Sequence, residues 1–286
     1  MNLRFYKNQL YFRKKIEMKK MKLLFVIVAL NFACSDSNKN KNETGIESEP
    51  NADVTEITEE KADEPKIYPV SHASFVMEWG NKIWYNDPVG PAVDFENYGN
   101  PDVILISDIH GDHFSVETLQ AIEGDFKIIA PQAVFDKMPT DLQEKSIIMN
   151  NDDTLSWESF EITAIPMYNI TEGRLQYHPK GRGNGYVIQQ QDYRMYISGD
   201  TENVDEMENL RDIDLALICM NLPYTMDIKQ AAEGVLTFSP KKVIPYHYRG
   251  LKDGENHFYD VEFFERIITL ENPDMKVQRL NWYPEN

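Results

Sequence analysis

The feature that most constrains this chain is a cluster of metal-binding side-chain types that follows a short apolar run. Residues 103–106 (VILI) are wholly apolar, as expected of a buried strand, and Ser115 is suited to cap a helix shortly after them. The loop between a strand's carboxyl end and a helix is where α/β folds build their sites. Here that loop carries four potential ligands, Asp108, His110, Asp112 and His113. The sequence therefore predicts a metal site in this loop.

The counts of histidine and cysteine support this interpretation. The chain has six histidines, and two of them fall in this one loop, so a solvated acidic loop with incidental histidines is a poor explanation. Its two cysteines, Cys34 and Cys219, are too few for a four-cysteine zinc site or a disulfide-stapled scaffold. Aspartate and histidine donors suit zinc, manganese or iron.

Strand-like and helix-like segments alternate over most of the remaining chain. Residues 67–79 and 82–85 are β-type runs separated by Gly80 and Asn81, which indicates a hairpin. Apolar composition predicts further strands at residues 103–106, 126–130, 146–149, 157–167, 185–189, 193–198, 215–220, 242–245 and 276–280. Helices are predicted after Ser115, after Pro131, and at residues 204–210, 228–238 and 261–270. Hairpins mixed with β–α alternation favour an α/β fold of mixed sheets covered by helices.

Three motifs in order resemble those of the metallo-β-lactamase-fold hydrolases. The segment Asp108-Ile-His-Gly-Asp-His113 resembles the family's H-x-H-x-D-H, which follows a strand. Tyr196-Ile-Ser-Gly-Asp-Thr201 resembles the strand followed by G-D-T, and Val243-Ile-Pro-Tyr-His247 resembles the last strand with its terminal histidine. The resemblance covers residues 68–250 and implies an αββα four-layer sandwich with the helices outside.

Further segments resemble the ascorbate-6-phosphate lactonase-like branch of that family. Tyr177-His-Pro-Lys-Gly181 and Gly185-Tyr186 resemble its H-P-x-G and G-Y elements. Ser71-His-Ala-Ser-Phe75 and Asn86-Asp-Pro-Val89 resemble its opening hairpin. This branch implies that His178 binds metal.

The resemblance implies a centre of two divalent metal ions. It places one ion on Asp108, His110 and His178. It places the other on Asp112, His113 and His247, with Asp200 bridging, and we assign the catalytic roles to Asp112 and Asp200. Two such ions would share a water and lower its pKa to about 7, so no serine or cysteine nucleophile is needed. Zinc is the expected metal, with manganese or iron as alternatives.

One position departs from the family's motif, because Asp108 stands where the first histidine is expected. If Asp108 coordinates, an anionic oxygen replaces an imidazole and favours harder ions. If it does not, the ion has fewer protein ligands. We expect coordination, and the departure leaves open a non-catalytic metal-binding protein.

Several other polar residues receive roles that do not include metal binding. We expect His72 to play a structural role in the opening hairpin, with substrate contact as the alternative. Asp87 is expected to support a turn or to hydrogen-bond a ligand histidine. His257 carries no motif, and Cys219 lies in an apolar run typical of a core thiol.

The first 66 residues are unlike the rest of the chain. Residues 1–33 hold eight basic side chains and one acidic one, and residues 23–30 (LLFVIVAL) have the length of a signal-peptide core, too short to span a bilayer. Ala33-Cys34 resembles a bacterial lipoprotein cleavage site, with lipid on Cys34 as the membrane anchor, and plain secretory cleavage is the alternative. Residues 34–66 are polar and predict a disordered tether, which leaves 67–286 as the hydrolase domain.

Charge helps to choose among substrates. The chain has 29 Lys+Arg against 47 Asp+Glu, a formal net charge of −18, which disfavours nucleic acid as a partner. The branch that the chain resembles implies opening of a lactone, ester or amide bond in a small-molecule substrate, and we expect this enzyme to be lipid-anchored at the bacterial cell envelope. Phosphodiester cleavage at the same site and a non-catalytic metal-binding lipoprotein are the alternatives.

Overall fold

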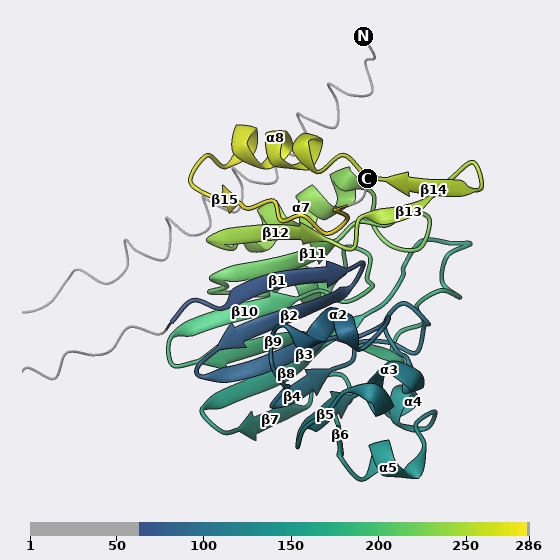
Figure 1. The fold of residues 1–286 in the computed structure, drawn as a ribbon. Helices are drawn as coiled ribbons and strands as arrows, with labels where there is room; N and C mark the ends of the chain where they lie inside the picture. The colour runs from purple at the N-terminus through teal and green to yellow at the C-terminus, as the bar shows by residue number, and fades with distance from the viewer. Residues whose placement is uncertain (1–62, 285–286) are drawn as a thin grey trace, which may run out of the picture. The chain divides into compact units, whose positions relative to one another are not determined.

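The computed structural model describes residues 63–284, which form two large sheets and a small hairpin (Figure 1). The predicted signal segment, Cys34 and nearly all of the predicted tether lie outside the described residues. None of the helices in residues 63–284 is long and apolar enough to cross a membrane.

The first sheet has six strands in sequence order. Its first three strands are antiparallel and the remaining strands pair in parallel. The strands are β1 (Lys66–Ser71), β2 (Ser74–Trp79), β3 (Lys82–Asn86), β4 (Val103–Leu105), β5 (Lys127–Ala130) and β6 (Ser146–Ile148).

The second sheet has seven strands in the order β15-β12-β11-β10-β9-β8-β7. Strands β7 to β10 are antiparallel, whereas β10, β11, β12 and β15 run parallel. Their bounds are β7 (Thr154–Trp157), β8 (Phe160–Met167), β9 (Gly183–Gln190), β10 (Tyr193–Ile197), β11 (Leu215–Cys219), β12 (Lys242–Tyr246) and β15 (Lys276–Val277).

The main core lies between the two sheets. Phe75 of β2 meets Tyr246 of β12 with ring centroids 6.2 Å apart, and Trp84 of β3 meets Phe160 of β8 at 4.8 Å. All four side chains are buried, as expected where two apolar sheet faces are removed from water. The two sheets are therefore the inner layers of the fold.

Helices cover the outer faces. Leu119, Val134 and Leu142 belong to a second core on the outside of the first sheet, and they come from α3 (Val116–Ala121), α4 (Gln132–Phe135) and α5 (Thr140–Gln143). On the second sheet, α7 (Ile228–Phe238) and α8 (Val261–Glu271) pack against each other and bury Val235 and Phe264. Two short helices, α2 (Val93–Glu96) and α6 (Asp205–Glu208), are the remaining helices of residues 63–284. The predicted αββα four-layer architecture of mixed sheets is confirmed.

Two predicted strands are each broken into a hairpin. The predicted strand at 67–79 divides into β1 and β2, with a turn at His72 (φ 58°) between them. The predicted strand at 157–167 divides at Glu158 (φ 53°) into β8 and the end of β7, which begins before residue 157. A left-handed residue other than glycine is uncommon and has no clear sequence signal. The hairpin of β13 (Arg249–Lys252) and β14 (Glu255–Phe258) was not predicted, because its polar sequence lacks strand composition.

Candidate metal centre

The predicted ligands gather at the carboxyl ends of strands from both sheets. The loop that starts after β4 carries Asp108, His110, Asp112 and His113, and His247 directly follows β12. Asp200 follows β10 through Gly199, which has φ +59°, and a Cβ at this glycine would lie 2.5 Å from the Met167 sulfur. The motif glycine therefore allows a close turn that directs the next residue toward the other ligands.

One group of three residues has the geometry of an open metal site. His113, Asp200 and His247 are buried, and their ligand atoms lie within 4.8 Å of one another. His113 Nε2 is 3.4 Å from Asp200 Oδ2, and His247 Nε2 is 3.1 Å from Asp200 Oδ1. Both His113 Nε2 and Asp200 Oδ1 lack a hydrogen-bond partner. Buried polar atoms without partners are costly, and a divalent ion bound here would satisfy both. We call these three residues the open group.

Asp87 holds the His113 ring in place from the other side. Its Oδ2 is 2.9 Å from His113 Nδ1, and its Oδ1 accepts the backbone N–H of Ser107 at 2.7 Å. Ser107 Oγ also lies 2.9 Å from His113 Nδ1. This contact fixes the ring so that Nε2 faces the open group, as expected for a metal-binding histidine.

The charges of the open group favour a cation. Burial alone raises the pKa of the Asp200 carboxyl, but the imidazoles of His247 and His113 hold this pKa well below its usual range. Burial lowers the pKa of His113, yet the carboxylates of Asp200, Asp112 and Asp87 raise it well above its usual value. In the absence of a metal, a proton on His113 partly offsets this negative charge, and a divalent ion would replace it.

Asp108, His110 and His178 also meet, but with an additional partner. His110 Nδ1 lies 3.0 Å and His178 Nε2 lies 3.8 Å from Asp108 Oδ2. Arg182, which the sequence did not indicate, donates Nε to Asp108 Oδ1 at 3.0 Å and Nη2 to Oδ2 at 2.7 Å. We call Asp108, His110 and His178 the arginine-paired group. The only sequence signal for the pairing with Arg182 is the presence of an arginine in the loop that follows His178.

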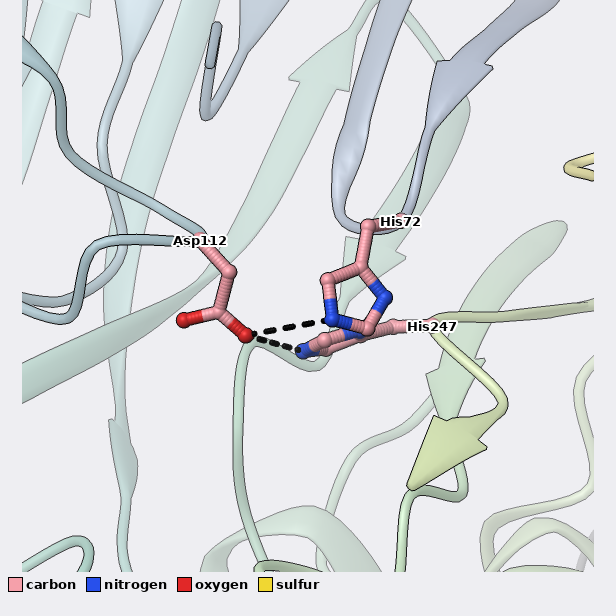
Figure 2. A group of neighbouring side chains, drawn as sticks. All are labelled: His72, Asp112 and His247. Carbon is pink, nitrogen blue, oxygen red and sulfur yellow. Dashed lines mark hydrogen bonds and ion pairs between the residues drawn. The ribbon is translucent and has the colours of Figure 1, made fainter. Parts of the chain in front are cut away.

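His72 lies in the centre, although the sequence favoured a structural role for it. Figure 2 shows His72 and His247 facing the same carboxylate oxygen of Asp112, at 3.3 and 3.6 Å from their Nε2 atoms. His72 Nδ1 is 3.0 Å from His247 Nδ1 and 2.9 Å from the Tyr283 hydroxyl. Its left-handed backbone at the β1–β2 turn carries the imidazole into the site, and such strain is common at functional residues.

A pocket of about 410 Å³ lies next to these residues, a volume that suits a small molecule. The β13–β14 hairpin contributes one wall with Arg249, Leu251 and Asn256. The other lining residues are His72, His110, Asp112, Tyr177, His178, Asp200, Asn221, Tyr224 and Gly250. Of the predicted site residues, His113 and His247 lie behind this surface with no exposed area, while Asp108 is covered by Arg182.

Comparison with known proteins agrees with this architecture. A model of the beta-lactamase superfamily domain matches residues 66–247. A UPF0173 metal-dependent hydrolase of Pyrobaculum islandicum is 30% identical over 216 residues, covering 68% of this chain and 91% of the relative. Its counterpart in Pyrococcus horikoshii is 27% identical over 193 residues, covering 64% and 84%.

Solved structures show the same fold. A crystal structure of a protein described as a metal-dependent hydrolase from Parabacteroides distasonis aligns with a TM-score of 0.66 and 34% identity, covering 77% of this chain and 94% of that one. A metallo hydrolase of Ignicoccus hospitalis has a TM-score of 0.62 at 21% identity, covering 76% and 94%, and shares the fold. The family model spans more than half of the chain. This chain therefore belongs to the metallo-β-lactamase superfamily, among its metal-dependent hydrolases.

Proposed function

We propose that this protein opens a lactone, ester or amide bond of a small-molecule substrate with water activated by a divalent metal ion. The observation that carries the proposal is the pair of buried, unpartnered atoms, His113 Nε2 and Asp200 Oδ1, beside a pocket that Asp200 lines. A divalent ion bound there supplies Lewis acidity and lowers the pKa of water toward 7. Zinc is the metal we propose first, because two imidazoles and a carboxylate suit it.

The side chains around the open group have separate tasks in this proposal. Asp200 faces the His113 and His247 imidazoles at 3.4 and 3.1 Å and would balance the charge of the ion. Asp112 lies in the pocket wall with 38% of its side chain exposed, so its carboxylate can hydrogen-bond the attacking water and orient it. His72 Nε2 lies 3.3 Å from Asp112 Oδ2 and keeps this carboxylate oriented. None of the residues lining this pocket is serine, threonine or cysteine, which agrees with water as the nucleophile.

The lactone, ester or amide substrate class rests on the resemblance to the ascorbate-6-phosphate lactonase-like branch. Phosphodiester cleavage is the second candidate, and the observation in its favour is Arg249, a cationic side chain in the pocket wall. The acidity of the chain favours the first candidate, because a net charge of −18 repels strongly anionic substrates at long range. A non-catalytic metal-binding protein is the third, and the Asp108–Arg182 pair is what favours it.

The test is metal-dependent turnover. Protein stripped with a chelator and reloaded with zinc, manganese or iron is assayed on matched panels of lactones, esters, amides and phosphodiesters. We expect turnover of a lactone, ester or amide that disappears on stripping, returns on reloading and is absent from the Asp200→Ala variant. Turnover of phosphodiesters alone would support the second candidate. Metal binding without any turnover would support the non-catalytic alternative.

We also propose that the protein is exported and held at the bacterial cell envelope by lipid on Cys34. The basic residues, the eight-residue apolar run and Ala33-Cys34 support this. Cells fed a labelled fatty acid should incorporate it into the wild type but not into Cys34→Ala. An unlabelled mature protein starting near this position would instead indicate plain secretory cleavage.

A further inference from the structure

We propose that Arg182 takes the place of one ion of the predicted pair, so that the centre holds a single divalent ion, at the open group. This inference rests on the proposed metal-dependent function, and it concerns how many ions the centre holds. It assigns a role to a residue that no motif indicated, and it explains why aspartate replaces the first histidine of the H-x-H-x-D-H pattern.

Arg182 donates hydrogen bonds to both carboxylate oxygens of Asp108. Its Nε and Nη2 atoms lie 3.0 and 2.7 Å from Oδ1 and Oδ2, which is the bidentate geometry of a strong arginine–carboxylate pair. Asp108 has no exposed side-chain area and Arg182 only 17%. An ion at Asp108 would have to displace this buried pairing, and the displaced guanidinium remains charged at any ordinary pH.

The same guanidinium also contacts the imidazole of His110. Nη2 of Arg182 lies 3.2 Å from His110 Nε2 and also donates to the backbone carbonyl of Tyr177. The other ring nitrogen of His110 lies 3.0 Å from Asp108 Oδ2. Two of the three residues of the arginine-paired group are thus paired already. His178 Nε2 has no hydrogen-bond partner and lies 3.3 Å from Oδ2 of Asp200, a residue of the open group. One imidazole beside a carboxylate that the open group already uses does not make a second metal site.

The open group differs in the charge of its neighbours. His113 Nε2 and Asp200 Oδ1 have no hydrogen-bond partner, and His247 Nε2 lies 2.9 Å from the Asn221 amide nitrogen and 3.1 Å from Asp200 Oδ1. The Asn221 amide is neutral, so it does not repel a cation as the Arg182 guanidinium does. No lysine or arginine of the described residues forms an ion pair with Asp200. A cation is therefore attracted to this group, whereas Arg182 repels it from the other.

The test counts ions and needs no substrate. Wild type saturated with zinc and freed of excess is expected to carry one zinc per chain by native mass spectrometry. Arg182→Met keeps the stem of the side chain but removes the charge, so it should carry two. Lys180→Met removes a positive charge from the same loop without touching Asp108, because Lys180 pairs with Glu206, and should carry one.

Manganese loading gives an independent reading. A single Mn²⁺ gives an uncoupled six-line EPR spectrum, and two neighbouring ions give an exchange-coupled one, so the coupled spectrum should appear only in Arg182→Met. A wild type that binds two coupled ions would overturn the inference. So would an Arg182→Met variant that folds and still binds one.

If Arg182→Met does not fold, Asp108→Asn decides instead. Because Asp108 is not a ligand in this inference, the variant keeps one zinc, whereas loss of one ion from a pair would contradict it. A wild type that binds no zinc at all would count against the proposed function itself, while a count of two would count only against the role of Arg182.

Discussion

The two ligand groups of this centre have the same residue types but opposite surroundings. Both contain histidine and aspartate, and Asp200 of the open group also lies 3.3 Å from His178 of the arginine-paired group. In the arginine-paired group, Arg182 compensates Asp108 from within the protein. In the open group, two buried atoms, His113 Nε2 and Asp200 Oδ1, have no hydrogen-bond partner. Ligand identity alone therefore does not define a metal site, because the charge that surrounds the ligands decides whether a cation can bind.

The largest loss of zinc affinity is expected from a substitution in the open group itself. Asp200→Ala removes the carboxylate that faces His113 and His247, so zinc affinity should fall by more than the roughly 10- to 100-fold typical of an outer partner. Isothermal titration with zinc measures it. Glu117→Ala, an acidic residue of α3 outside the pocket, is the control and should leave affinity unchanged. Equal affinity of Asp200→Ala and wild type would remove the distinction between the groups.

A smaller effect is expected where the open group is oriented from behind. Asp87→Ala leaves the ring of His113 without its 2.9 Å partner at Nδ1, so zinc affinity should fall about 10- to 100-fold. Asp87→Asn, which retains one acceptor oxygen, should lose less. The same titration measures both variants. If neither changes the affinity, the orientation of His113 is not set by Asp87.

A third change tests the side of the open group nearest the pocket. His72→Ala removes the imidazole that lies between Asp112 and His247, so kcat should fall about 10-fold or more while the zinc count stays at one. Turnover on the active member of the substrate panel and native mass spectrometry measure the two quantities. Loss of the zinc ion in this variant would instead make His72 a ligand.

The smallest effect is expected at Cys219, beneath the open group. Its sulfur lies 3.6 Å from both the Thr201 carbonyl and Thr225 Oγ1, and burial, with Asp200 nearby, raises the thiol pKa to about 11. The thiol of the unfolded chain ionises at a lower pH than the thiol of the folded protein. The buried, protonated thiol therefore contributes its full share to stability below the ordinary thiol pKa, and this contribution is lost as pH rises through the pKa of the folded thiol. Cys219→Ala should leave zinc affinity unchanged and should weaken the decline of stability above about pH 9, measured by denaturant unfolding. A native thiol that reacts rapidly with disulfide reagents at pH 8 would contradict its burial.

The sequence supports the fold where patterns are local. Apolar runs predicted the parallel strands, and the ligands that follow β4, β10 and β12 could be placed from strand ends and motif spacing. The turn at His72 was missed because a left-handed residue inside a β-type run has no pattern of its own. Arg182 was missed because it pairs with a residue 74 positions away, and such contacts are set by tertiary packing.

We expect the metal ion to bind at His113, Asp200 and His247. Anomalous X-ray scattering from zinc-loaded crystals tests it most directly, because it locates the ion without any assumption about substrate. We predict a strong peak at about 2.0–2.1 Å from the Nε2 atoms of His113 and His247. A zinc-loaded crystal with no peak at these three residues, or with its only peak at Asp108 and His110, would contradict it.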